Sequence, residues 1–168
     1  LLEPPGRVCP GVISTGGVLV IPAGGSSTPA AASSSSSSSM NDEMRANAAV
    51  IVQVGRSLGV SDYGIVIALA TAMQESSLRN LSWGDLDSVG LFQQRPSSGW
   101  GTVDELTNPS RAAELFFVGR SGIRGLLDIS GWESMPLTQA AQRVQISAYP
   151  DACAKWESSA GEWLAELG

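Results

Sequence analysis

The stretch from Ser61 to Ser77, SDYGIVIALATAMQESS, decides the fold of this 168-residue chain. Ser61 is a suitable N-cap for a helix that runs from Asp62 to about Ser77. Its apolar side chains recur at helical spacing and form one broad face: Ile65, Ala68, Leu69, Ala72 and Met73. We therefore expect this helix to be the most buried one of a domain that is mainly α.

Helical patterns also occur on both sides of this stretch. Capping residues, prolines and apolar spacing predict further helices over residues 42–58, 109–117, 136–148 and 151–167. Residues 79–100 are dense in Gly, Ser, Asp and Pro and cannot continue a helix. Within them, Val89, Leu91 and Phe92 predict a short irregular strand, so we expect a helical domain with one irregular β excursion.

The first 41 residues have a different composition. They are rich in Gly, Pro, Ser and Ala, and Ser33 to Ser39 is an unbroken serine run with no apolar atoms to bury. We interpret residues 1–41 as a low-complexity arm and linker, and residues 42–168 as the folded domain. Because the arm holds only Glu3 and Arg7, the whole net charge of −6 lies in the domain.

Charge and composition exclude several function classes. A net charge of −6 is opposite to the basic footprint of a nucleic-acid-binding protein. No apolar run reaches the roughly 18 residues that a membrane span requires. Histidine is absent, which excludes Ser/His/Asp and Cys/His catalytic sets and His-ligated zinc. We predict no metal and no cofactor, so any chemistry depends on carboxylates, hydroxyls, thiols or lysine.

The two cysteines, Cys9 and Cys153, lie far apart in the sequence. They are either one disulfide that ties the arm to the domain or two unrelated thiols. We predict the disulfide, which mapping of free thiols tests.

Glu75 lies at the C-terminal end of the predicted buried helix, where the chain leaves the core. Apolar surroundings and the negative end of a helix dipole make its carboxylate costly to ionise, so we expect a raised pKa, as a general acid requires. The alternative is an exposed terminal glutamate. Asp85 and Asp87 follow in the loop and are candidates for a second catalytic carboxylate, with turn stabilisation as the alternative.

These residues carry a resemblance to a known family. Gln74-Glu75-Ser76-Ser77, followed by Ser88-Val89-Gly90-Leu91-Phe92-Gln93, resembles the paired signature of soluble lytic transglycosylases and goose-type lysozymes. In that group a Glu-Ser pair ends a helix and precedes a Gly-Leu-Met-Gln strand, and Phe92 stands here in place of the usual Met. The resemblance also extends to the transglycosylase-like domains of secreted actinobacterial proteins.

Three shorter segments resemble other parts of this family. Asn108-Pro109 with the following helix is similar to its third block, and Trp83-Gly84-Asp85 is similar to the goose-type loop that supplies a second acid. Ala148-Tyr149 resembles the fourth block, although Pro150 stands where Asn is usual. The position after the strand that is acidic in goose-type enzymes is occupied by Gln94 and Arg95.

The resemblance implies a lysozyme-like fold and a secreted or cell-wall-associated enzyme that cleaves peptidoglycan glycan strands. It implies that Glu75 is the general acid, with either Asp85 or Asp87 activating water, or the sugar's own 6-hydroxyl attacking to give an anhydro product. We lean toward the second route. The residues expected to bind the substrate are Ser88, Gln93, Trp83, Trp100 and Tyr149.

Other functions stay open at this stage. A catalytically inactive cell-wall-binding or scaffold module on the same fold is compatible with the incomplete set of acidic residues. A helical interaction domain without a glycan partner is a third possibility, but it leaves the pairing of Glu75 and Gln93 unexplained. The oligomeric state is not predicted.

Overall fold

The structure is a computed structural model that describes residues 40–146 and 150–168. The α-helices in this part are α1 (Asp42–Ser57), α2 (Asp62–Ser76), α3 (Val103–Leu106), α4 (Pro109–Val118), α5 (Leu137–Gln145) and α6 (Glu157–Leu167). Short 3₁₀ turns connect them: η1 (Pro96–Ser98), η2 (Leu126–Asp128), η3 (Trp132–Ser134) and η4 (Ala154–Trp156). The mainly α class that the sequence predicts is therefore confirmed.

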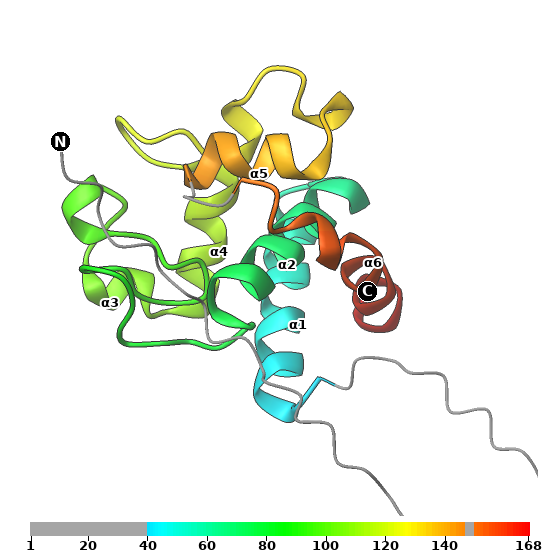
Figure 1. Cartoon of the computed structure of the whole chain (residues 1–168), viewed down its shortest axis with the longest axis horizontal. Helices are drawn as coiled ribbons and strands as arrows, with labels where there is room; N and C mark the ends of the chain where they lie inside the picture. The colour runs from blue at the N-terminus through cyan, green and yellow to red at the C-terminus, as the bar shows by residue number, and fades with distance from the viewer. Residues whose placement is uncertain (1–39, 147–149) are drawn as a thin grey trace, which may run out of the picture. The chain divides into compact units, whose positions relative to one another are not determined.

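Helix α2 is the centre of the packing and contacts α1, α4, α5 and α6 (Figure 1). Every residue from Ile67 to Ala72 is buried, so this helix is apolar and buried around its whole circumference. Two glycines allow the close approach of its neighbours. A Cβ on Gly55 of α1 would lie 2.6 Å from Ile65 Cγ1, and one on Gly64 would lie 2.4 Å from Val60 Cγ1. The prediction of a buried second helix is confirmed.

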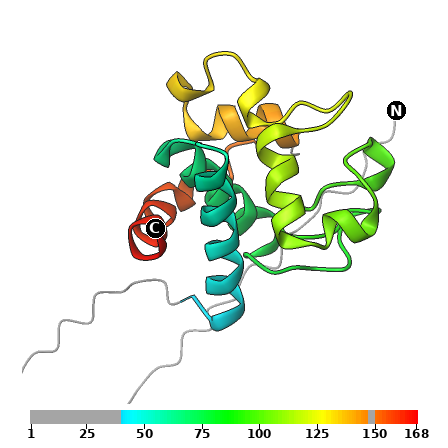
Figure 2. The same cartoon turned by 180° about the vertical axis from the view of Figure 1, so that it is seen from behind.

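Helix α1 lies beside α4 on the side of the molecule that Figure 2 shows in front. Aromatic rings join α4 to the segment that follows α2. The rings of Phe92 and Phe116 stack with centroids 4.6 Å apart, and Phe117 meets Phe116 edge to face at 5.7 Å. All three side chains are fully buried. This cluster fixes the irregular segment onto the helical core.

The predicted strand at Val89, Leu91 and Phe92 does not form. Val89 makes an isolated antiparallel bridge with Gln94, and the residues between them form a turn. Two residues of this turn have left-handed backbones, Gly90 at φ 79° and Gln93 at φ 48°, and these conformations interrupt an extended chain. The β character of this excursion is limited to the bridge.

Two helix boundaries differ from those predicted. Helix α5 ends at Gln145, before the predicted end, because Ile146 adopts a left-handed conformation at φ 49°. Helix α6 begins at Glu157 because turns and η4 occupy residues 150–156. Helix α3 was not predicted, although Thr102 and Glu105 form a complete capping box at its start.

Helix α1 begins at Asp42. Asn41 caps the helix, with Oδ1 accepting a hydrogen bond from the Met44 amide at 2.9 Å. The rest of the predicted arm, apart from Met40, lies outside the described residues. None of the helices in the described part of the chain is long and apolar enough to cross a membrane.

Candidate active site

Glu75 is the penultimate residue of α2 and is half-buried at the point where the helix leaves the core. Burial raises its pKa from 4.5 to about 7, because a carboxylate loses favourable hydration there. The space around its side chain is too narrow for a water molecule, and its lining is Thr71, Ala141, Gln142, Gln145, Pro150 and Cys153. Near neutral pH a large share of Glu75 therefore holds a proton that it can donate.

Ser76 joins the end of α2 to the turn at residues 90–93. Its hydroxyl is buried and donates to the Leu91 carbonyl oxygen at 2.7 Å, and it also lies 3.1 Å from the Ala72 carbonyl oxygen. The first two sequence blocks are thus in direct contact through the serine of the Glu-Ser pair. This contact fixes the backbone next to Glu75 against a buried segment.

The chain reverses immediately after Ser76. Ser77 and Leu78 both have left-handed backbones, at φ 55° and 56°. The reversal is held from α1, where the Asn47 side-chain amide donates to the Leu78 carbonyl oxygen at 2.8 Å. The amide oxygen of Gln74 accepts a hydrogen bond from the Trp156 indole at 3.1 Å. Both sides of Glu75 along the chain are therefore anchored by hydrogen bonds.

Asp87 stabilises the loop through its own hydrogen bonds. Its Oδ1 accepts from Arg95 Nε at 2.8 Å and from the Ser97 hydroxyl at 2.9 Å, and its Oδ2 accepts from the Ser97 amide at 2.7 Å. These donors, with Arg95 the strongest, hold the pKa of Asp87 well below its usual range. Asp85 is exposed, and its carbonyl oxygen accepts from the Ser88 amide at 2.8 Å.

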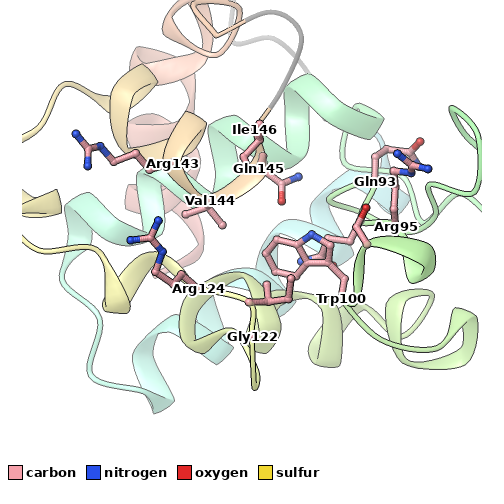
Figure 3. A pocket seen from close by; sticks show the side chains of 12 residues that line it. Gln93, Arg95, Trp100, Gly122, Arg124, Arg143, Val144, Gln145 and Ile146 are labelled. Carbon is pink, nitrogen blue, oxygen red and sulfur yellow. The ribbon is translucent and has the colours of Figure 1, made fainter.

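An open cavity of about 500 Å³ lies between the turn at residues 93–100, the loop at residues 122–124 and the end of α5 (Figure 3). Its lining is Gln93, Gln94, Arg95, Ser98, Trp100, Gly122, Ile123, Arg124, Arg143, Val144, Gln145 and Ile146. Glu75 does not itself line this cavity. Gln145 lines both the cavity and the narrow space around Glu75, so the two spaces have this residue in common.

Only one of the two polar atoms of the Gln145 side chain has a hydrogen-bond partner among the described residues. Its Nε2 donates to the carbonyl oxygen of Phe92, which connects α5 to the second sequence block. Its Oε1 is buried and has no hydrogen-bond partner within the described residues.

Two of the predicted substrate-binding residues line the cavity. Gln93 donates from Nε2 to the Gly90 carbonyl oxygen at 3.1 Å and to that of Trp83 at 3.3 Å. Gly84 leaves the space for this side chain, because a Cβ there would lie 1.8 Å from Gln93 Oε1. The indole of Trp100, only 8% exposed, lies at the cavity floor in Figure 3.

The other predicted residues lie elsewhere. Ser88 is buried, whereas Trp83 is 68% exposed, and neither lines a cavity that contains Gln93 or Glu75. Asp85 and Asp87 line neither space. Tyr149 lies outside the described residues. The structure thus places Gln93 and Trp100 at the cavity and Glu75 at the neighbouring space that shares Gln145 with it. Ser88, Trp83, Asp85 and Asp87 lie in the loop outside both spaces.

Cys153 is a free thiol buried beside Glu75. Burial, with a smaller contribution from the charge of Glu75, raises its pKa to about 11. It is therefore protonated and is not an activated nucleophile. Cys9, the predicted disulfide partner of Cys153, lies outside the described residues, so the disulfide stays a prediction.

Sequence reasoning missed several cavity residues, chiefly Arg124, Arg143 and Gln145. Arg143 and Gln145 are on the exposed and intermediate positions of an amphipathic helix, where such side chains are ordinary. Arg124 follows a Gly-containing turn and belongs to no motif. These three residues come together at the cavity only when the chain folds. Neither a family model nor a curated protein matches the chain.

Proposed function

We propose that this domain cleaves peptidoglycan glycan strands between N-acetylmuramic acid and N-acetylglucosamine, with Glu75 as the general acid. The single observation that carries the proposal is the environment of Glu75. Glu75 is a half-buried carboxyl group, and burial raises its pKa to about 7. The space around it shares one lining residue, Gln145, with an open cavity. A proton donor with a pKa near the working pH is what glycosidic cleavage needs.

The sequence resemblance to lytic transglycosylases and goose-type lysozymes gives this chemistry its substrate. The two segments that carry the resemblance are in contact in the structure. The hydroxyl of Ser76, in the Glu-Ser pair, donates a hydrogen bond to the carbonyl oxygen of Leu91, in the second segment. A lysozyme-like arrangement of the helices is part of the proposal. Action on peptidoglycan implies a location outside the cell or in the cell wall.

The first step is transfer of the Glu75 proton to the bridging oxygen as the bond to the muramic acid C1 breaks. Positive charge then develops on that sugar ring. The indole of Trp100 and the amide of Gln93 are the described groups that offer a sugar an apolar surface and a hydrogen-bonding partner in the cavity.

The second step needs a nucleophile, and we propose the sugar's own 6-hydroxyl. The carboxylate of Asp87 is occupied by Arg95 and Ser97, and its lowered pKa makes it a weak base. Asp85 is exposed and lines neither space. Glu75, ionised after the first step, then accepts the 6-hydroxyl proton, and the product carries a 1,6-anhydro ring.

Substitution of the carboxyl groups tests these assignments. Glu75→Gln should lower the release of sugars from purified peptidoglycan by at least about 100-fold, because it removes the donated proton. Glu162→Gln is the matched control, since Glu162 is exposed on α6. Release within a few fold of wild type by Glu75→Gln would refute the role of Glu75.

The loop aspartates separate the two routes. Asp85→Asn and Asp87→Asn should each retain most of kcat if the 6-hydroxyl attacks, with losses confined to substrate binding and loop order. A large kcat loss in either variant would show that a second carboxylate activates water and would make the enzyme a hydrolase.

A second candidate is a cell-wall-binding module without activity. Two observations favour it: the space at Glu75 admits no water molecule, and Glu75 does not line the open cavity. Such a module would sediment with purified peptidoglycan while neither wild type nor Glu75→Gln releases any sugar.

A further inference from the structure

The arginines of the described residues divide into two groups by their partners. Those that form ion pairs with carboxylates are Arg45, Arg56, Arg79, Arg95, Arg111 and Arg120. Arg124 and Arg143 form no ion pair with any carboxylate in residues 40–146 and 150–168, and both line the open cavity. In a chain with a net charge of −6, two cations without a carboxylate partner at one cavity require a reason.

The loop that carries Arg124 has a fixed backbone. Arg120 and Ile123 exchange two backbone hydrogen bonds, of 3.0 and 2.8 Å, across a tight turn. Gly119 and Gly125 close the base of the turn so tightly that a Cβ on Gly125 would lie 2.3 Å from the Gly119 nitrogen. The backbone position of Arg124 is therefore fixed by the turn.

The same turn is tied to the floor of the cavity. Arg120 Nη1 donates to the Trp100 carbonyl oxygen at 3.2 Å and lies 3.2 Å from a Glu105 carboxylate oxygen. The position of Arg124 relative to the Trp100 indole is thus set by contacts that do not involve Arg124 itself.

Arg143 approaches the cavity from the last turn of α5, next to the buried Val144. Figure 3 shows Arg124 and Arg143 on one side of the cavity, Gln93 and Arg95 on the other, and Trp100 between them. Arg95 is already paired with Asp87, so the free positive charge is confined to the side with Arg124 and Arg143.

We propose that this side of the cavity binds a carboxylate of the peptide stem that branches from the muramic acid residues. The inference rests on the proposed function, which supplies strands that carry such stems. A guanidinium group presents parallel N–H donors that match a carboxylate, and a pair of guanidiniums outcompetes water better than a single one. A cavity of about 500 Å³ accommodates a ligand of a few residues.

The cavity also relates this carboxylate to the reacting bond. Gln145 lines the cavity opposite the loop of Arg124 and also lines the space around Glu75. Arg143 and Gln145 both belong to the last turn of α5, so a stem bound at Arg143 keeps its strand near the residue that also lines the space around Glu75. The arginine pair would therefore select strands that bear stems over strands that lack them.

Titration calorimetry with soluble glycan strands tests this inference. The probes are strands with intact peptide stems and the same strands after an amidase has removed the stems, both titrated into the full-length Glu75→Gln protein so that no cleavage occurs. We expect stem-bearing strands to bind about tenfold more tightly, the effect of one charge-assisted contact. In Arg124→Ala/Arg143→Ala the ratio of the two affinities should fall to about one.

The matched control is Arg45→Ala/Arg56→Ala. It removes the same charge from α1, where both arginines pair at the surface with Glu166 and Asp62. This control should keep the tenfold ratio, which salt should weaken. A ratio of one in the unsubstituted background, or an unchanged ratio in Arg124→Ala/Arg143→Ala, would overturn the inference. Tighter binding of a glycerol phosphate oligomer than of stem-bearing strands would overturn it in favour of a phosphate polymer.

Cleavage is measured separately, so that the two proposals fail separately. Release of sugars by wild type from stem-free strands depends on Glu75 and not on the arginine pair. A preserved affinity ratio without any cleavage would retain the stem site and refute the proposed activity, whereas cleavage without a preference for stems would do the reverse.

Discussion

At the scale of single residues, Glu75 and Asp87 show how surroundings give two carboxyl groups opposite properties. Burial without a cationic partner raises the pKa of Glu75, whereas Arg95 and Ser97 lower that of Asp87. Only the first can donate a proton near neutral pH, and only the second is held as an anion.

The first prediction at this scale concerns the pH dependence of cleavage. Because Glu75 must be protonated to act as an acid, kcat/KM should fall about tenfold for each pH unit above its pKa of about 7. The rate of sugar release, measured from pH 5 to 9, gives this decrease in kcat/KM directly. A rate that stays constant up to pH 9 would contradict the assignment of Glu75.

The second prediction concerns Ser76. Ser76→Ala leaves the buried Leu91 carbonyl oxygen without its 2.7 Å donor, which should lower the free energy of unfolding by about 1–3 kcal/mol. Ser57→Ala is the control, because Ser57 makes a similar bond to the Val54 carbonyl oxygen at an exposed site. That variant should stay within about 0.5 kcal/mol of wild type in a urea titration. Equal effects of the two variants would mean that burial of this bond does not matter.

At the scale of elements, the turn at residues 89–94 depends on the close approach of Gly90 to α3. Gly90 has a left-handed backbone at φ 79°, and a Cβ there would lie 1.9 Å from the Leu106 carbonyl oxygen. The backbone of the second sequence block therefore touches a helix end that follows it in the chain. This contact and the stacking of the Phe92 ring on Phe116 together fix the position of the turn against the helical core.

A pair of glycine variants tests this contact. Gly90→Ala combines a left-handed alanine with a collision against backbone and should cost about 3–4 kcal/mol of unfolding free energy. Gly59 has a similar φ of 71° with no atom within 4 Å of an added Cβ, so Gly59→Ala should cost only about 1 kcal/mol. Chemical denaturation of both variants gives the difference, and similar losses would show that the approach to Leu106 is not tight.

The sequence predicted elements better than their junctions. Periodicity and terminal residues identified α1, α2 and α4 closely, because each follows a polar residue and repeats apolar side chains at helical spacing. The strand prediction at Val89 failed because apolar residues in sequence do not reveal the left-handed turn that Gly90 and Gln93 make. For the site, Glu75 follows from its position at the end of a buried helix. The arginines at the cavity do not, since their proximity arises only from packing.

At the scale of the whole molecule, the charge state of Glu75 is linked to folding. Its pKa is 4.5 when the chain is unfolded and about 7 when folded, so the folded state binds the proton more tightly between these values. The stability contribution is complete below pH 4.5 and is lost as the pH rises through 7. The total is at most about 3 kcal/mol.

This linkage predicts a difference between wild type and Glu75→Gln that depends on pH. Gln carries no proton to lose, so Glu75→Gln should gain stability relative to wild type as the pH rises from 5 to 8. Melting temperatures across this range measure the gain, with Glu162→Gln, which replaces an exposed glutamate of α6, as the control variant. Parallel curves for wild type and Glu75→Gln would mean that Glu75 titrates in the folded protein as an exposed glutamate does.

Mass spectrometry of the sugars that the protein releases from purified peptidoglycan tests the proposed activity of Glu75 most directly. We expect disaccharide products with 1,6-anhydromuramic acid ends from wild type, and none above background from Glu75→Gln. Sugars with reducing ends would replace the intramolecular attack with hydrolysis. No released sugar from wild type, or the same products from Glu75→Gln, would contradict the claim that Glu75 cleaves glycan strands.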